Sequence, residues 1–335
     1  MPRYGIPLES RVSPMPISPF IALTDKNWFD HLKRNANADH IVDEANFWSP
    51  KAQTPPAKMD PGQPVFLRLK SPYYAIAGVG FYTAFHVLPM DEAWQLFQWR
   101  NGDATCADFY SRIRGYRSSD PPEESMAKPI GCMILSSVEL WDESRWMPWG
   151  VEQGFATNIV RGMGVRDPAQ VAQLMSLIGT GAQIRAGEFA DRFQLVDADG
   201  RRWRDQSAQA VREGQGGFRL RLLDAYGRQC AITGEHTEPV LDAAHIQPYL
   251  GPASNHVQNG MLLTKEFHAL FDRGYVTVTP EHIVKVSSYL KKDFSNGRRY
   301  YPYDGQVLAK LPDDARLLPS ADALQWHGAN VFRAG

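Results

Sequence analysis

The segment from Leu241 to Val278, LDAAHIQPYLGPASNHVQNGMLLTKEFHALFDRGYVTV, constrains the fold more than any other part of the chain. The residues before Pro248 have the pattern of a short strand, and proline prevents its simple continuation, so His245 is expected at a strand end. Asn259 is followed by glycine and suits a turn. The segment therefore predicts that polar side chains far apart in the sequence meet around one hairpin.

A short helix is expected directly after this hairpin. Thr264 is a suitable N-cap, and Gly274 follows the last periodic residue. Within the helix, His268 and Asp272 are four residues apart and share one face. Both side chains can then reach one cation.

These residue types suit metal-assisted hydrolysis of a phosphodiester, which needs a base for the attacking water and a cation for the phosphoryl charge. His245 can act as a base near neutral pH, and Asn259 can hold the loop that carries it. Each residue alone is more often structural. Their order and spacing together favour a catalytic site.

With these residues, the chain resembles the HNH endonucleases of the ββα-metal fold. The longer stretch QGGFRLRLLDAYGRQCAITGEHTEPVLDAAHIQPY is similar to bacterial restriction endonucleases. The resemblance implies that His245 is the general base, that Asn259 orients the active-site loop, and that His268 ligates the catalytic metal.

The segment departs from that family in two places. Many relatives carry a metal ligand directly before the base, but Ala244 stands there. Asp242 lies two residues earlier on the same strand face, so we assign it as a ligand beside His268 and Asp272. Cys230 has no partner cysteine nearby, so no structural zinc is expected. The mixed imidazole and carboxylate set favours one Mg²⁺ or Mn²⁺ ion.

The N-terminal half has the pattern of a curved sheet with helices. Residues 65–70 alternate between apolar and polar side chains, as in a half-buried strand. Residues 75–85 form a nearly apolar run with Gly78 and Gly80, which suits a strand that curls round a small barrel. Residues 130–140 predict another strand. We expect this α+β domain to end near Trp149.

The motifs NFWSP, PGQPVFLRLKSPYYAIAGVGFY and IGCMILSSVELW in this half resemble the PUA-like superfamily, which includes EVE and ASCH domains. The resemblance implies a β-barrel, and fusions of such a barrel to an HNH domain look like modification-dependent restriction enzymes. Such a barrel encloses an extruded base between aromatic side chains. Our candidates are Trp48, Tyr73, Tyr74 and Phe81, although each also suits a packed core.

The expected fold class is α+β, with an N-terminal PUA-like β-barrel domain and a C-terminal ββα-metal (HNH) nuclease domain. The predicted divisions are residues 1–150 for the barrel, 151–205 for a connecting region and 206–335 for the nuclease. The glycine-rich REGQGGF, residues 212–218, marks the entry to the nuclease domain. Residues 218–226 are expected to be helical.

Composition agrees with a two-domain intracellular protein. A chain of 335 residues exceeds the size at which a single core usually stops growing. Three cysteines fit a reducing compartment, and no segment resembles a membrane span, so we expect a cytoplasmic protein. The net charge is only −1, so contact with DNA must come from local positive charge. Arg219, Lys265 and Arg273 are our candidates.

Together these features predict an endonuclease for double-stranded DNA that reads a modified base, most simply a modified cytosine. Cutting both strands favours a homodimer. One alternative is an HNH endonuclease indifferent to base modification. Another is a catalytically silent DNA-binding protein, which Ala244 and the modest charge would fit. An RNA substrate also stays open, because the metal chemistry does not distinguish the sugar.

Overall fold

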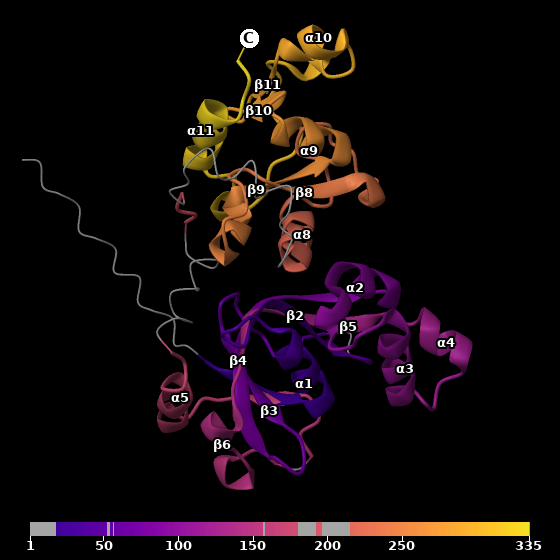
Figure 1. Cartoon of the computed structure of the whole chain (residues 1–335), viewed down its shortest axis with the longest axis vertical. Coiled ribbons are helices and arrows are strands. Elements are labelled where there is room, and N and C mark those ends of the chain that lie inside the picture. The colour runs from indigo at the N-terminus through magenta and orange to yellow at the C-terminus, as the bar shows by residue number, and fades with distance from the viewer. Residues whose placement is uncertain are drawn as a thin grey trace, which may run out of the picture.

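The computed structural model describes residues 18–51, 54–55, 57–156, 158–179, 192–195 and 215–334. It has an N-terminal region built on one large sheet and a C-terminal region built on a small hairpin and helices, one above the other in Figure 1. The expected boundary between residues 205 and 206 lies outside the described residues. The mixture of helices and strands confirms the α+β class.

The N-terminal sheet has seven strands in the order β2-β5-β4-β3-β1-β7, with β6 paired to β4. They are β1 (Phe20–Thr24), β2 (Ile41–Ser49), β3 (Pro64–Leu69), β4 (Ala75–Leu88), β5 (Ile130–Leu140), β6 (Met147–Pro148) and β7 (Gly162–Gly164). β1 and β3 are parallel, and the other described pairs are antiparallel. The apolar runs of the sequence thus form the central strands.

The expected closed β-barrel is not formed. Among the described residues, the end strands β2 and β7 do not pair with each other, so the hydrogen-bonded path stays open. The sheet is nevertheless curved, because β4 has register shifts against β5 at Val79/Phe81 and Tyr82/Ala84. At Gly78 a Cβ would lie 2.4 Å from the Glu139 carbonyl oxygen, so only glycine fits this close strand approach.

Helices cover the two faces of this sheet. They are α1 (Lys26–Asn35), α2 (Met90–Phe97), α3 (Cys106–Tyr116), α4 (Pro122–Ala127) and α5 (Pro168–Met175). The Asp25 carboxylate caps α1 by accepting a hydrogen bond from the Asn27 amide at 2.9 Å. α1 buries Trp28 and Phe29 against one face, and Leu174 of α5 belongs to the core on the other.

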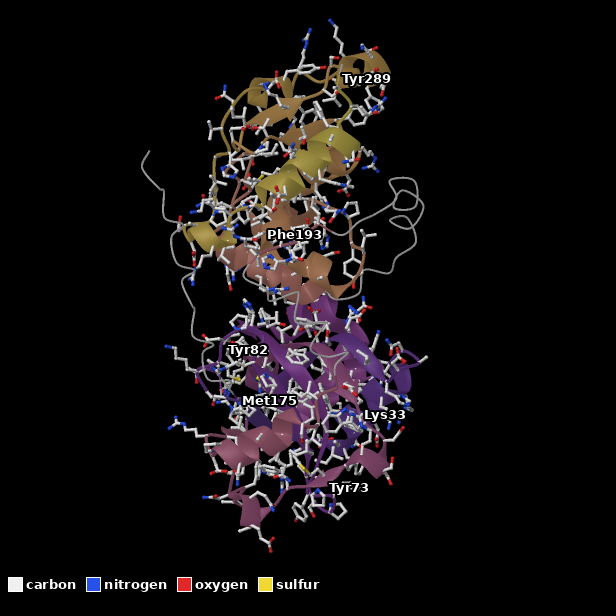
Figure 2. All side chains as sticks on the ribbon, turned by 90° about the vertical axis from the view of Figure 1, so that its left-hand side faces the viewer. Lys33, Tyr73, Tyr82, Met175, Phe193 and Tyr289 are labelled. Atoms are coloured by element: carbon white, nitrogen blue, oxygen red, sulfur yellow. The ribbon has the colours of Figure 1, made fainter. Side chains whose placement is uncertain are left out.

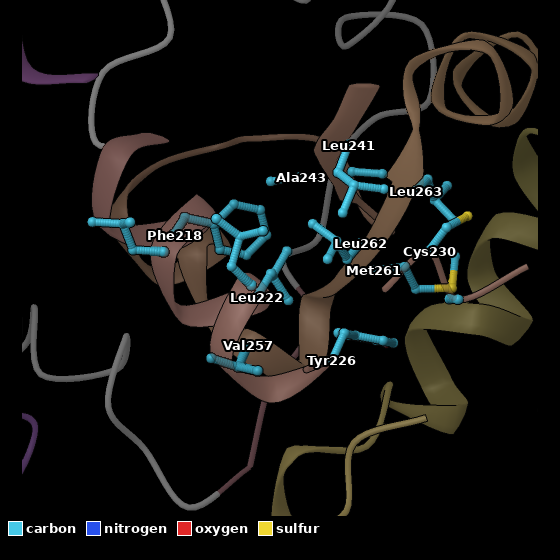
Figure 3. Close-up of a cluster of buried hydrophobic side chains, with 14 of the residues drawn as sticks. Phe218, Leu222, Tyr226, Cys230, Leu241, Ala243, Val257, Met261, Leu262 and Leu263 are labelled. Atoms are coloured by element: carbon cyan, nitrogen blue, oxygen red, sulfur yellow. The ribbon is translucent and has the colours of Figure 1, made fainter. Parts of the chain in front are cut away.

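The C-terminal region follows the helix α8 (Gln215–Ala225). Its remaining elements are β8 (Leu241–His245), β9 (Gly260–Thr264), α9 (Lys265–Asp272), β10 (Val276–Val278), β11 (Val284–Val286), α10 (Tyr289–Phe294) and α11 (Ala321–Asn330). Figure 3 shows Phe218 and Leu222 of α8, and Tyr226 directly after it, beside the apolar side chains of β8 and β9. The hairpin therefore packs against α8.

One buried cluster continues from the N-terminal region into the C-terminal region. It includes Phe97 of α2, Phe109 of α3, Ile134 of β5 and Phe218 of α8. α8 thus packs against both regions at once. In the part of the chain that is described, no helix combines the length and apolar character that crossing a membrane requires.

Candidate active site

The hairpin of β8 and β9 followed by α9 forms a ββα unit. The two strands are antiparallel, and His245 at the end of β8 faces Gly260 at the start of β9. α9 begins after Thr264, although the Thr264 side chain makes no capping hydrogen bond. Gly274 follows the helix with a φ of 73°, a left-handed conformation that favours glycine. Phe267 and Phe271 bury the inner face of α9, which fixes its outer polar face.

His268 lies between two carboxylates. Its Nδ1 is 2.8 Å from Oδ2 of Asp242, and its Nε2 is 3.4 Å from Oδ2 of Asp272. The His268 side chain is 10% exposed and that of Asp272 is 50% exposed, so the Nε2 side opens to solvent. The structure therefore brings these three predicted residues together.

Asp242 is electrostatically matched to this histidine. Burial by itself would raise the pKa of Asp242, but the hydrogen bond and charge of His268, the Ala243 amide and Arg219 outweigh it and hold the pKa below its ordinary value. The carboxylate is therefore ionised and accepts the Nδ1 proton. This contact orients the ring and leaves Nε2 as the nitrogen through which His268 could hold a cation.

A divalent cation fits this donor set if water and substrate oxygens supply its remaining ligands. The described residues contain no group of three or more His, Cys, Asp or Glu side chains that could hold a metal ion. Nε2 of His268 and the carboxylate of Asp272 offer two donors on the open side. Mg²⁺ is commonly bound by one or two side chains while waters and phosphate oxygens complete its shell.

His245 lies three positions after Asp242 on β8, so the alternation of a strand places it on the opposite face from Asp242. Its ring stacks on Phe218 of α8, with centroids 4.2 Å apart and planes 10° apart. Its Nε2 is 3.0 Å from Oδ1 of Asn255. The ring of Tyr249 stands at its edge, 6.0 Å away. His245 is thus held by an aromatic face and an amide.

Asn259 is fully buried and ties together the loop that follows β8. Its Oδ1 accepts from the Gln247 amide at 2.8 Å, and its Nδ2 donates to the carbonyls of Gln247 and Ser254, both at 2.9 Å. The same loop carries Asn255. Asn259 therefore fixes the backbone from which Asn255 reaches His245.

Two residues of this site were missed by the sequence analysis. Asn255 stands ten residues after His245 in a stretch of irregular turns, and Phe218 precedes it on a separate helix. The sequence offered only a weak signal for Asn255, as an amide in a proline- and glycine-bounded loop. It offered none for Phe218, whose contact with His245 arises from tertiary packing.

The two positions at which the sequence departs from the family, Ala244 and Cys230, are both buried. Ala244 is fully buried against the core and supplies no donor. The Cys230 sulfur accepts hydrogen bonds from the amides of Thr233 and Thr264, at 3.4 and 3.3 Å. Cys230 thus stabilises the end of β9 and the turn before β8 by accepting hydrogen bonds from backbone amides.

The predicted DNA-contacting residues fall into two groups. Arg219 donates to the carbonyls of Leu241 and Glu238, at 2.7 and 3.4 Å, so its guanidinium is engaged in holding the start of β8. Lys265 and Arg273 are exposed at the two ends of α9. These two cations flank the polar face that carries Asp272.

The N-terminal region contains a cavity of about 440 Å³. Aromatic side chains of α1, β2, β4 and α3 line it, and ionic side chains stand among them. The lining includes Trp28, Phe47, Trp48, Phe85, Tyr116, Asp25, Lys70, Arg112 and Arg161. Its volume lies in the range of small-molecule sites.

Of the four aromatic residues predicted for such a pocket, only Trp48 lines the cavity. Tyr73 and Tyr74 are 41% and 49% exposed outside it, and Figure 2 shows Tyr73 at the end of the molecule farthest from the C-terminal region. Phe81 is buried in the core on the opposite face of the sheet. Trp28 of α1 and Phe47 of β2 were missed, because the periodicity of a helix or strand does not by itself distinguish a cavity wall from a core.

The cavity walls are rigidly held. The Trp48 indole nitrogen donates to the Asn101 carbonyl at 2.8 Å, and its ring meets Tyr116 edge to face at 6.0 Å. Arg112 pairs with the buried Asp103 at 2.7 Å. Burial raises the pKa of Asp103 to about 6, although Arg112 opposes this shift.

Residues 230–279 match the family described as HNH endonuclease. They contain β8, β9 and α9, so the expected HNH unit is confirmed for this part of the chain, and it identifies an endonuclease domain. The match covers less than half of the chain. No relative with a curated description matches the sequence.

Several solved structures are distantly similar. The ASCH protein from Zymomonas mobilis has 10% identity and a TM-score of 0.31, covering 48% of this chain and 94% of that protein. A mutant of the same protein gives 8% identity and a TM-score of 0.33, covering 48% and 96%. The modification-dependent TagI restriction endonuclease gives 13% identity and a TM-score of 0.25, covering 92% and 81%.

Proposed function

We propose that the chain, whose residues 230–279 are an HNH endonuclease domain, is a modification-dependent DNA endonuclease. The nuclease unit hydrolyses a phosphodiester, and the N-terminal cavity receives a modified base. The observation that carries the proposal is the ββα unit itself, in which the Asp242–His268–Asp272 cluster adjoins the strand that ends at His245.

His245 is the general base. When Nε2 donates its proton to Oδ1 of Asn255, the lone pair remains on Nδ1, which can take a proton from the attacking water. The stack on Phe218 restrains rotation of the ring about the Cβ–Cγ bond. The scissile phosphate would lie across the end of β8.

Nε2 of His268 and the carboxylate of Asp272 would hold one divalent ion, Mg²⁺ or Mn²⁺. When bound, such an ion neutralises charge on the phosphoryl oxygens and stabilises the leaving oxygen. We propose that Asp242 orients His268 through Nδ1, in preference to the direct ligation expected from the sequence. Lys265 and Arg273 would contact neighbouring phosphates.

The cavity of the N-terminal region is the proposed reader. Its aromatic walls can stack on a nucleobase, and Asp25, Lys70 and Arg112 can hydrogen-bond to the base edge. A modified cytosine is the proposed ligand because it is small enough for about 440 Å³ and carries a polar edge. The protein would act on double-stranded DNA in the cytoplasm, and a homodimer would cut both strands.

Matched DNAs test this proposal. The protein is incubated with Mg²⁺ or Mn²⁺ and phage DNAs that contain cytosine, 5-methylcytosine, 5-hydroxymethylcytosine or glucosylated cytosine. We expect cleavage of at least one modified DNA and little cleavage of the unmodified one. Equal cleavage of all four would contradict the reader function, and no cleavage of any would contradict the nuclease function.

A further inference from the structure

The N-terminus of α8 is docked in the N-terminal region by a buried carboxylate. Glu44 of β2 is 4% exposed, and its Oε2 accepts a hydrogen bond from the Gly217 amide at 2.7 Å. A carboxylate at a helix N-terminus is stabilised by the unpaired amides and the helix dipole. The first turn of α8 is therefore fixed by a residue of the large sheet.

Two glycines make this docking close. A Cβ on Gly217 would lie 2.6 Å from Oε2 of Glu44, and one on Gly216 would lie 2.7 Å from the ring of Phe97. A larger residue at either position would have to displace the Glu44 carboxylate or the Phe97 ring, or move α8 away from the sheet. The glycine-rich stretch expected to mark a domain entry thus serves as a tight helix contact.

The next residue of α8 reaches the proposed base. Phe218 stacks on His245, and its ring also lies over Gly260, where a Cβ would be 2.6 Å from Cζ of Phe218. Gly260 is the cross-strand partner of His245. Phe218 therefore packs against both residues of the cross-strand pair that contains His245.

Glu44 shares its strand with the wall of the cavity. Phe47 and Trp48 line the cavity from β2, three and four residues after Glu44. At the rise of a strand, this separation is about 10 to 13 Å. β2 thus contacts the cavity near its C-terminal end and the N-terminus of α8 near its middle.

We propose that Phe218 is a positioning residue for His245 and that Glu44 links this position to the cavity wall. A base that enters the cavity presses on Phe47 and Trp48, and β2 passes the displacement through Glu44 to α8. The link rests on the proposed function, because it assumes that the cavity receives a base and that His245 acts in cleavage. Through this link, the cutting step would depend on the base modification, in addition to DNA binding.

A second contact between the same helix and the same sheet provides a control. Asp224 near the end of α8 lies 3.6 Å from Nε2 of His86 on β4. Replacing Asp224 weakens the docking of α8 without touching Glu44 or Phe218. If docking of α8 alone set the rate, Asp224→Asn would also lower it, although by less than Glu44→Ala because Asp224 is 59% exposed.

The test compares wild type with Glu44→Ala, Glu44→Gln and Asp224→Asn, using DNA with and without 5-hydroxymethylcytosine. We expect Glu44→Ala to lower kcat on modified DNA by about 10- to 100-fold, as small misplacements of a catalytic group do. Its KM should change little. Glu44→Gln keeps an acceptor oxygen and should retain most of the rate, and Asp224→Asn should resemble wild type.

A second readout is the NMR signal of the His245 ring, assigned by comparison with His245→Gln and measured without metal. A short hydroxymethylcytosine oligonucleotide should move this signal in wild type and not in Glu44→Ala. Unchanged cleavage by Glu44→Ala, equal losses in Glu44→Ala and Asp224→Asn, or equal signal changes in wild type and Glu44→Ala would each overturn the link. A wild-type protein that cleaves no DNA would instead contradict the proposed function, while the NMR comparison still tests the link.

Discussion

Asn255 is the residue whose role in the site is most specific, because it is the hydrogen-bond partner of Nε2 of His245. Removing its carbonyl oxygen frees the imidazole to change tautomer. We predict that Asn255→Ala lowers kcat for plasmid cleavage by about 10-fold or more and alters its pH profile. Asn330→Ala, at an exposed asparagine of α11, is the control. A wild-type pH profile and rate in Asn255→Ala would remove this role.

The His268 cluster makes a prediction about metal binding that does not require DNA. Mn²⁺ binding is measured by calorimetry for wild type, His268→Ala, Asp272→Asn and Asp242→Asn. We expect His268→Ala to lose binding, and Asp242→Asn to weaken it by about 10- to 100-fold, as orienting partners of a metal ligand do. Unchanged Mn²⁺ affinity in His268→Ala would show that the ion sits elsewhere.

Single residues also show where sequence reasoning reached its limit. His245, Asn259, His268 and Asp272 could be chosen because their spacing follows from one hairpin and one helix. Phe218 could not, because its contact with His245 joins segments whose approach depends on packing. The same limit applied to the cavity, where Trp48 was the one aromatic chosen that lines it.

Among the elements, α11 is coupled to α9 by a buried histidine. His327 stacks on Phe271 with centroids 3.7 Å apart, and its Nδ1 lies 2.8 Å from the Thr277 hydroxyl. Burial lowers the pKa of His327 from 6.5 to about 3, although its hydrogen bond to the Phe271 carbonyl opposes this. In the unfolded chain the imidazole takes up its proton at a much higher pH than in the folded protein.

The stability of the fold should therefore depend on pH through His327. Its contribution is complete above pH 6.5 and is lost as the pH falls from 6.5 toward about 3, because protonation then favours the unfolded chain. Urea unfolding at neutral pH and at about pH 5 measures this loss. We expect a smaller loss in His327→Gln than in wild type, and the wild-type loss in the exposed-site control His236→Gln. Equal losses in all three would contradict the assignment.

Secondary structure was predictable where hydrophobic periodicity agreed with the residues that end a helix or strand. The hairpin strand before Pro248 and the helix ended by Gly274 have both signals. α8 begins at Gln215 and not at Phe218, because the Glu44 contact outweighs the low helix propensity of Gly216 and Gly217. Tertiary contacts decided that boundary.

For the whole molecule, the sequence predicted the α+β class and an HNH unit, but not the open sheet. Curvature could be inferred from Gly78 and Gly80, whereas closure depends on whether the two end strands meet. The sequence also gave no sign that one core joins both regions through α8. Both properties come from long-range packing, which local patterns do not encode.

At the scale of the whole molecule, we propose that His245 is the base of a divalent-metal nuclease. The most direct measurement is the nicking of supercoiled DNA that carries 5-hydroxymethylcytosine, in Mn²⁺, by wild type and by His245→Gln purified in the same way. We predict a rate about 100- to 10,000-fold lower for His245→Gln, with unchanged Mn²⁺ binding. Undiminished nicking by His245→Gln would contradict it.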